Sequence, residues 1–485
     1  MEVFRNIGML SNAFLINISF ITQYIGIRTR RSVLMDAHAQ AITADRTVSR
    51  DDSDTQRSKK LRWFFIALLV IGGVVNYLDR SNLSIANTTI AKEFNLDSTQ
   101  MGLILAAFSW PYAIANLPAG YLVDKFGPKR IYSWAATLWS VVSLLSATAS
   151  TYGLFYAFRV ALGISESPFF TAGLKVCDNW FDEKEKALPV SIVNTGSQIA
   201  NAIAPPLLTI LLIKTGWRGM FLIIGGLGLL VTVIWMVCYR NPSVKEIAAI
   251  KGEDWQKQAA SEKQSKQQNS QSGANKKSWI SLFKQSQTYF MIIGAFGIFY
   301  TVWVYLTWLP TYLQKAEGFD LMTSGWLAML PYLCGIVGVL CGGWISGKML
   351  KMGYKTITSR KVPIVAGAFL AAFAVLPVAY MHNVTLTMIL LCVGYFASQI
   401  PIGCMWTLAS DIAEPDQVSS LGAIQNFGGF VGAAAAPMVT GYILDQTGQN
   451  FTLAFVVAGV LLLVGAFSYL IFVNEPASKK RGIAQ

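Results

Sequence analysis

The chain has 485 residues, of which 53% are hydrophobic and only 13% charged, and its formal net charge is +13. Soluble globular domains carry about 25% charged residues, so this composition excludes an ordinary soluble protein. The basic residues gather in loops between apolar segments, so we expect the lipid bilayer, and no nucleic acid, as a partner. The two histidines are His38 and His382, and the six cysteines lack CxxC spacing. We therefore expect no metal, no other cofactor and no enzymatic activity.

Residues 1–60 are expected to form a disordered cytoplasmic tail outside the membrane-spanning fold. Residues 8–26 are moderately apolar but are interrupted by Ser, Asn and Gln, and no small-residue cleavage site follows them. Met35 then opens a polar segment. We expect translation to start at Met35, which leaves residues 1–34 untranslated.

Apolar segments long enough to cross a bilayer follow one another from residue 61 onward. Backbone groups in lipid must bond internally, so each segment is expected to be a helix. The twelve predicted spans are 61–86, 100–122, 128–150, 152–174, 189–213, 218–239, 288–313, 323–349, 362–381, 384–408, 419–444 and 451–474. We expect an all-α membrane protein with six-helix halves over 61–239 and 288–475, joined by a polar cytoplasmic linker over 240–287, with a cytoplasmic tail over 476–485.

The first predicted span ends in NYLDRSNL, residues 76–83, which carries Asp79 and Arg80. A charge at membrane depth is costly and indicates a functional site. Adjacent helical residues point about 100° apart, so the two side chains cannot face one partner. We expect Asp79 to titrate and Arg80 to face an anionic substrate. The alternative is a structural ion pair near the helix end.

The loop GYLVDKFGPKR, residues 120–130, joins the second and third spans. Asp124 is expected to face a helix N-terminus, where negative charge is favoured. Arg130 is expected to pair with an acidic group of the other half, a polar contact that could hold one side of the molecule closed and so act as a gate. The alternative is an ordinary charged turn. A degraded copy in the second half has Gly347 at the position of the acid.

The fourth span carries Arg159 and Glu166 within RVALGISE. Seven residues place them on one helix face about 10 Å apart, so an anion-binding arginine and a proton-binding carboxyl could share one cavity without pairing directly. The alternative is that Glu166 is a structural group. Other polar and aromatic side chains in the spans suit a polyhydroxylated ligand as a set, although each alone is more commonly a packing residue; they are Tyr77, Tyr112, Asn194, Gln198, Trp406, Gln425 and Asn426.

The two halves repeat one another. Asn194, Gly196, Pro205 and Thr215–Gly216 match Asn426, Gly428, Pro437 and Thr447–Gly448, all at an offset of 232 residues. Parallel six-helix repeats of this kind bind substrate near the midplane between the halves.

These motifs together resemble the anion:cation symporter branch of the major facilitator superfamily. The resemblance rests on NYLDRSNLSIA, the loop at 120–130, RVALGISESPFF and NWFDEKEKA, and it covers residues 61 to 475. Within that branch the chain is most similar to bacterial hexonate carriers of the galactonate type. The resemblance implies a monomer that takes up a small anionic substrate with protons across the bacterial inner membrane.

The resemblance also implies roles for individual residues. It assigns proton coupling to Asp79 and Glu166. It assigns substrate binding to Tyr77, Arg80, Tyr112, Arg159, Trp406 and Asn426. The glutamine of the fifth span falls on Ser197 in strict register and on Gln198 one step away, so both are candidates. Gly403 stands where the galactonate type has a small hydroxyl residue.

We therefore expect a symporter that imports a monovalent sugar acid by alternating access. One alternative is an exchanger of organic anions or organic phosphates, which would show counterflow without a response to pH. The other is a membrane sensor that binds the sugar acid without transporting it, which uptake into proteoliposomes would distinguish.

The distribution of Lys and Arg predicts that both termini and the linker are cytoplasmic. A cysteine introduced at Asn269 should therefore resist a membrane-impermeant thiol reagent in intact cells and react after the cells are opened. The unchanged chain gives the background of its six native cysteines. Ready labelling in intact cells would reverse the predicted orientation.

Overall fold

The computed structural model describes residues 61–181, 187–243, 246–247, 279–381, 383–413 and 418–474. The expectations for the tails at 1–60 and 476–485, for most of the 240–287 linker, and for His38 and His382 lie outside these residues. The chain divides into two units, Met1–Trp63 and Phe64–Gln485. The contacts described below lie within the second unit.

The N-terminal helices begin with one that spans Leu61–Phe94. The others are α2 (Ser98–Ala106), α3 (Ser109–Phe126), α4 (Pro128–Ser146), α5 (Tyr152–Glu166), α6 (Pro168–Trp180) and α7 (Ala187–Cys238). The C-terminal helices are α10 (Ser286–Lys315), α11 (Leu321–Lys351), α12 (Thr356–Val378), α13 (Val384–Ile412), α14 (Val418–Gln446) and α15 (Thr452–Phe467), with short helical turns η1 (Trp279–Lys284) before them and η2 (Ser468–Phe472) after them. Each predicted span coincides with a helix or a pair of helices, so the all-α prediction is confirmed.

Two predicted spans are interrupted, and two others are joined. The 100–122 span breaks between α2 and α3, and the 152–174 span breaks at Ser167 between α5 and α6. Pro111 and Pro168 follow these breaks, and a proline cannot donate to the carbonyl four residues before it. The spans at 189–213 and 218–239 run together as α7 across Gly216, whose φ of 70° and ψ of 172° are not helical. Nine described helices are long and apolar enough to cross a membrane.

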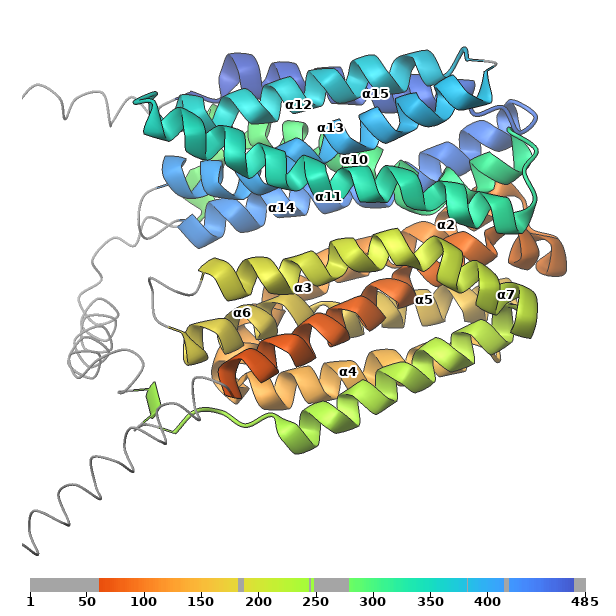
Figure 1. Ribbon diagram of the computed structural model, residues 1–485, viewed down its shortest axis with the longest axis horizontal. Helices are drawn as coiled ribbons and strands as arrows, with labels where there is room; N and C mark the ends of the chain where they lie inside the picture. The colour runs from red at the N-terminus through yellow and green to blue at the C-terminus, as the bar shows by residue number, and fades with distance from the viewer. Residues whose placement is uncertain are drawn as a thin grey trace, which may run out of the picture. The chain divides into compact units, whose positions relative to one another are not determined.

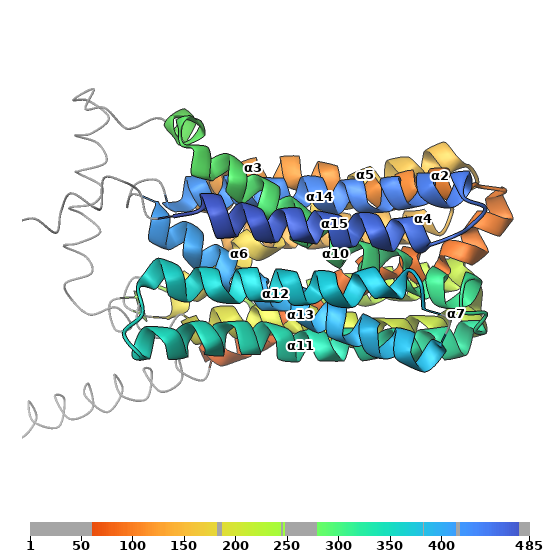
Figure 2. The same ribbon diagram turned by 90° about the horizontal axis from the view of Figure 1, so that it is seen from above.

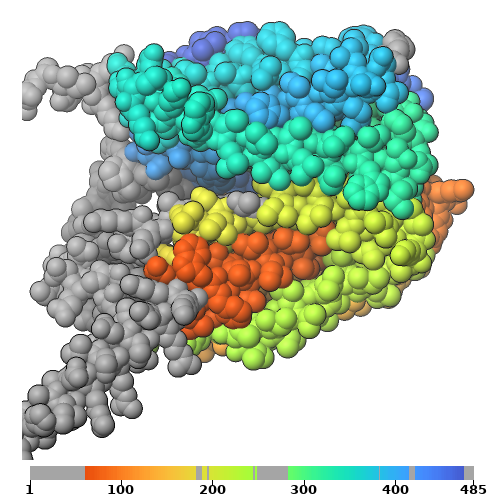
Figure 3. Space-filling model, viewed as in Figure 1, coloured from red at the N-terminus to blue at the C-terminus, as the bar shows by residue number. Residues whose placement is uncertain are grey.

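The helices run side by side in two groups (Figures 1 and 2). Within the N-terminal group α4 packs on α5, α6 and α7, and within the C-terminal group α13 packs on α11 and α12 while α14 packs on α10. In the space-filling view the C-terminal helices, green to blue, and the N-terminal helices, red to yellow-green, occupy separate sides of the face shown (Figure 3). The two groups touch through α2 with α14 and through α7 with α11.

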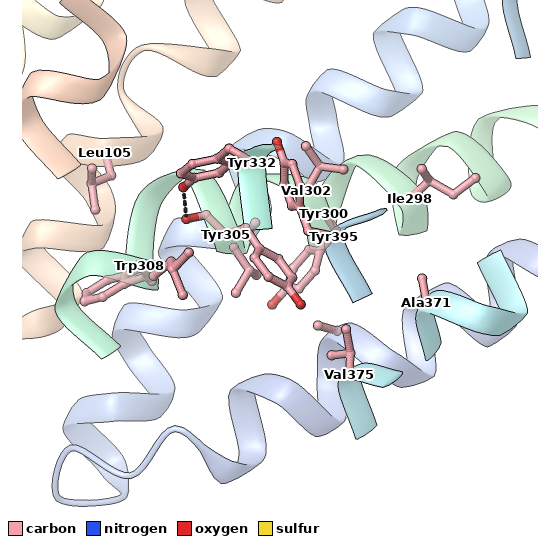
Figure 4. Close-up of a cluster of buried hydrophobic side chains, with 14 of the residues drawn as sticks. Leu105, Ile298, Tyr300, Val302, Tyr305, Trp308, Tyr332, Ala371, Val375 and Tyr395 are labelled. Atoms are coloured by element: carbon pink, nitrogen blue, oxygen red, sulfur yellow. Dashed lines mark hydrogen bonds between the residues drawn. The ribbon is translucent and has the colours of Figure 1, made fainter. Parts of the chain in front are cut away.

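Buried aromatic side chains fill the interior of the C-terminal group (Figure 4). Tyr305, Tyr332 and Tyr395 are each at most 3% exposed. The Tyr332 hydroxyl donates to the Tyr305 carbonyl at 2.9 Å (Figure 4). A buried hydroxyl without such a partner would be destabilising, so this bond helps to hold α11 against α10.

The contact between α2 and α14 depends on glycine. A Cβ atom at Gly102 would lie 2.3 Å from the Pro437 carbonyl oxygen, and one at Gly441 would lie 2.2 Å from the Ser98 carbonyl oxygen. No larger residue fits at either position without moving a backbone. The two helices therefore approach as closely as small residues allow, which is how helices pack tightly in lipid.

Hydrogen bonds join the two groups near the N-terminus of α2. The Asp445 carboxylate accepts from the Ser98 backbone N–H at 2.9 Å and from the Thr99 backbone N–H at 2.6 Å. It also accepts from the Thr99 hydroxyl at 2.5 Å. Asp97 takes the next backbone N–H, that of Gln100. The first N–H groups of a helix lack partners within it, so a carboxylate from another helix is well placed there.

Further hydrogen bonds between the two groups of helices join the first helix to α10. The Ser84 hydroxyl donates to the Thr307 carbonyl at 2.9 Å, and the Asn87 amide donates to the Thr311 hydroxyl at 3.0 Å. The predicted topology places this end opposite the lysine-rich loops, on the outer face. We call this set of contacts the α2 seal.

Asp445→Ala should weaken the α2 seal, because it removes an acceptor of three hydrogen bonds. A hydrogen bond to a charged group is worth about 2 kcal/mol, which corresponds to roughly a 30-fold shift of an opening equilibrium. Thr307 is 4% exposed and takes part in the seal through its backbone carbonyl. A cysteine at this position should therefore react many-fold faster with a soluble thiol reagent in the Asp445→Ala background.

The matched control is Asp320→Ala. Asp320 caps α11 by accepting from Met322 and Thr323 of the same helix. Its loss should leave labelling of the introduced cysteine unchanged. Equal acceleration by both variants would mean that general loosening, and not the seal, limits access.

Candidate functional site

Asp79 and Arg80 of the first helix face different partners. Arg80 faces Glu166 at the end of α5, while Asp79 faces Ser143 of α4. Consecutive helical residues point about 100° apart, so the two side chains diverge as the sequence predicts. The first helix therefore contributes to two polar groups at once.

The first group is a buried ion pair. The Arg80 Nε donates to the Glu166 Oε2 at 2.7 Å, with the side chains 9% and 0% exposed. The guanidinium also lies over the rings of Tyr77, Phe108 and Tyr112, at 4.6, 4.8 and 4.9 Å from their centroids. Aromatic faces attract a cation, and the attraction is stronger where water is excluded. We call Arg80, Glu166 and these three rings the Arg80 group.

The second group surrounds Asp79. The Asp79 Oδ1 accepts from the Ser143 hydroxyl and, at 3.4 Å, from the Asn82 amide. The Arg159 Nη2 in turn donates to the Asn82 Oδ1 at 2.9 Å, and its Nη1 donates to the Asp79 carbonyl at 3.4 Å. Asp79, Asn82 and Arg159 are each at most 2% exposed. The Asn82 amide thus links the carboxylate of Asp79 to the guanidinium of Arg159.

Arg159 and Glu166 share α5, as predicted, but bond to different residues. Glu166 bonds to Arg80, and Arg159 bonds to Asn82 and to the Asp79 backbone. Burying an unpaired charge costs several kcal/mol, so each charged side chain takes a partner from the first helix. Asn82 lies within the predicted motif NYLDRSNL, but neither it nor Ser143 was singled out, because an amide or hydroxyl in an apolar helix is usually a packing residue.

The candidates from the C-terminal helices come together in a crevice. It is lined by Phe299 of α10, by Ile402, Met405 and Trp406 of α13, and by Gln425 and Asn426 of α14. Trp406 is 48% exposed, whereas Gln425 is 3% exposed. Trp406 of α13 and Asn426 of α14, both predicted to bind substrate, therefore line the same crevice.

Aromatic rings connect the Arg80 group to this crevice. Tyr112 lies 4.8 Å from Phe430, and Phe430 lies 6.0 Å from Phe299, measured between ring centroids. Phe108 stacks on Trp303 at 6.3 Å. Such ring pairs add favourable contact beyond the burial of their area. Sequence reasoning missed Phe108, Phe299 and Phe430, because an aromatic residue in an apolar helix is ordinarily a core residue.

Ser197 and Gln198 lie on α7. Ser197 is buried, and Gln198 is partly buried. Their neighbour Gly196 packs against Val70, where a Cβ atom would lie 3.1 Å from the Val70 carbonyl oxygen. This contact places the segment beside the first helix. A role in binding substrate stays a prediction for both residues.

The two predicted gating residues are exposed. Asp124, near the end of α3, accepts from the Lys175 ammonium of α6 at 2.9 Å, with the side chain of Asp124 67% exposed. The expected position of Asp124 facing a helix N-terminus stays a prediction. Arg130 is exposed and makes no ion pair with the part of the chain that the structure describes. Gating by these two residues stays a prediction.

The described residues contain no group of three or more His, Cys, Asp or Glu side chains that could hold a metal ion. The polar chemistry of the site therefore consists of two arginines, two carboxyls and several amides and hydroxyls. Such a set can bind an organic anion and exchange protons.

Several known proteins resemble this chain in sequence. The family model of the Major Facilitator Superfamily matches residues 69–437 and 357–485. The chain is 35% identical over 425 residues to the probable L-galactonate transporter of Escherichia coli (strain K12), covering 88% of this chain and 92% of that protein. It is 31% identical over 443 residues to the probable galactarate/D-glucarate transporter GarP of the same strain, covering 87% and 98%.

A solved structure supports the fold. The crystal structure of a bacterial homologue of the human lysosomal transporter Spinster, in an inward-facing and unoccupied conformation, superposes with a TM-score of 0.70. The match covers 85% of this chain and 97% of that one at 16% sequence identity. At that identity the likeness concerns the fold alone.

Proposed function

This chain belongs to the major facilitator superfamily, and from that premise we propose that it imports a hexonate such as galactonate together with protons. The proposed site of action is the bacterial inner membrane, with both termini in the cytoplasm. Names of relatives support a sugar acid as substrate. Proton coupling is argued below from the charged groups.

The Arg80–Glu166 ion pair carries the proposal. A substrate carboxylate and the Glu166 carboxylate would compete for the same guanidinium, because both are anions that bind Arg80. A proton on Glu166 removes that competition and frees Arg80 for the substrate. Arg80 keeps one further donor for this purpose, since its Nη2 has no partner among the described residues. Binding of the anion and binding of the proton would therefore favour one another.

The group around Asp79 supports a second proton position. The Asp79 Oδ2 has no hydrogen-bond partner among the described residues, while Oδ1 accepts from two donors. A buried carboxyl with one free oxygen can hold a proton there, whereas its ionised form would be poorly satisfied. Arg159 bonds to the other end of the Asn82 amide. Loss of the proton from Asp79 would therefore change the electrostatic environment of the Arg159 guanidinium.

Transport would follow from alternating access. The α2 seal closes one end of the interface between the two groups of helices. Opening that end and closing the other would carry a bound sugar acid and its protons across the membrane, as in other proteins built from parallel six-helix repeats.

Arg159→Lys should weaken binding of galactonate. Lysine keeps the charge but loses the planar fork with which Arg159 reaches Asn82 and the Asp79 carbonyl and would reach a carboxylate. Loss of a buried charged hydrogen bond of about 2 kcal/mol raises Kd roughly 30-fold. Isothermal titration calorimetry of the purified protein with galactonate measures this Kd.

Arg218→Lys is the matched control, since Arg218 pairs with Glu93 at a partly exposed site. Its Kd should stay within about twofold of the unchanged protein, because exposed ion pairs contribute little. Near-normal affinity in Arg159→Lys would assign the substrate carboxylate to Arg80 alone.

Glu166→Gln should separate binding from proton-driven accumulation. Glutamine resembles the protonated acid and leaves Arg80 free, so the variant should bind galactonate and exchange labelled for unlabelled substrate. It should not concentrate galactonate in response to a pH gradient, because it has no proton to release. Counterflow and gradient-driven uptake in proteoliposomes measure the two activities.

Glu93→Gln is the control, because Glu93 is also paired with an arginine but lies at the exposed end of its helix. It should keep both activities. Accumulation by Glu166→Gln at the normal level would remove Glu166 from the proton path. Counterflow without any pH response in the unchanged protein would instead favour an exchanger.

A further inference from the structure

The crevice between α10, α13 and α14 has no charged side chain among the described residues that line it. Its described lining consists of four apolar side chains and two amides, those of Gln425 and Asn426. The charged residues singled out for the substrate, Arg80 and Arg159, lie instead on the first helix and on α5. A ligand that reaches both places would meet cations at one end and neutral amides at the other.

Gln425 has one hydrogen-bonding atom left open. Its Nε2 donates to the Met405 carbonyl at 3.1 Å. A carbonyl can only accept, so this bond determines which way the amide points. The opposite atom, Oε1, is buried and has no partner among the described residues. A buried acceptor without a donor is destabilising, so the site is suited to a ligand that supplies an O–H or N–H group.

The open atom discriminates between two classes of sugar acid. A hexonate carries a carboxylate at one end and a hydroxyl at the other, and that hydroxyl can donate to Oε1. A hexarate carries a second carboxylate in place of this hydroxyl. An ionised carboxylate has no proton to donate. It would be buried beside an acceptor, and the described residues that line the crevice include no cation.

We propose that Gln425 is a specificity-determining residue that binds the hydroxyl-bearing end of the substrate and selects monoacids over diacids. This inference rests on the proposed transport of sugar acids. It goes beyond the comparisons, because relatives named for galactonate and for galactarate/D-glucarate match the chain at 35% and 31% identity.

Galactonate and galactarate form a matched pair of ligands, since they differ only at the sixth carbon. Titration of the purified unchanged protein should show galactonate binding at least about tenfold tighter than galactarate. Gln425→Met keeps the length of the side chain and removes the acceptor. The substitution should raise the Kd of galactonate roughly five- to tenfold and leave the Kd of galactarate within about twofold, so that most of the preference for galactonate is lost.

Gln285→Met is the control, because Gln285 is exposed and makes no side-chain cap to α10. It should bind both ligands as the unchanged protein does. Equal affinity for the two ligands in the unchanged protein, or tighter binding of galactarate, would overturn the inference without any variant. An equal loss for both ligands in Gln425→Met would also overturn it, and binding of neither ligand to the unchanged protein would refute the proposed function itself.

Discussion

The cost of burying charge away from water is the constraint on which the site depends. Arg80, Asp79, Arg159 and Glu166 are all buried or nearly so, and an isolated charge in such a place would cost several kcal/mol. Arg80 and Glu166 pair with one another across two helices. Asp79 accepts from Ser143 of α4, and Arg159 donates to Asn82 of the first helix. The first helix, α4 and α5 must therefore stay packed together for any of these charges to be tolerated.

The two groups of helices contribute different chemistry. The N-terminal helices supply the singled-out charges, and the C-terminal helices supply amides, methionine and aromatic side chains at the crevice. Aromatic rings fill the space between them, from Phe108 and Tyr112 to Phe299 through Phe430. This division matches a ligand with one charged end and one neutral hydroxylated end, since each end meets groups that can satisfy it.

The α2 seal uses a different device from the buried site. The carboxylate of Asp445, a residue near the end of α14, lies at the N-terminus of α2. There it accepts hydrogen bonds from backbone N–H groups that have no partner within α2. Close approach at Gly102 and Gly441 brings the carboxylate within reach. The seal is polar and lies near helix ends, so breaking it exchanges protein hydrogen bonds for hydrogen bonds to water, whereas the side chains of the charged site are 9% exposed or less.

The sequence by itself determined the helical class, the order of the apolar spans and the charged candidates, because segment length, apolar content and charge at membrane depth are local properties. It did not determine where the helices break or join. It also determined that Asp79 and Arg80 diverge and that Arg159 and Glu166 stay apart, since helical geometry imposes both. Only the tertiary structure decided the partners. Glu166 bonds to a residue 86 positions away, and the Gln425 amide is oriented by a carbonyl 20 positions away. Such contacts depend on how separate helices pack, which neither periodicity nor spacing along one helix specifies.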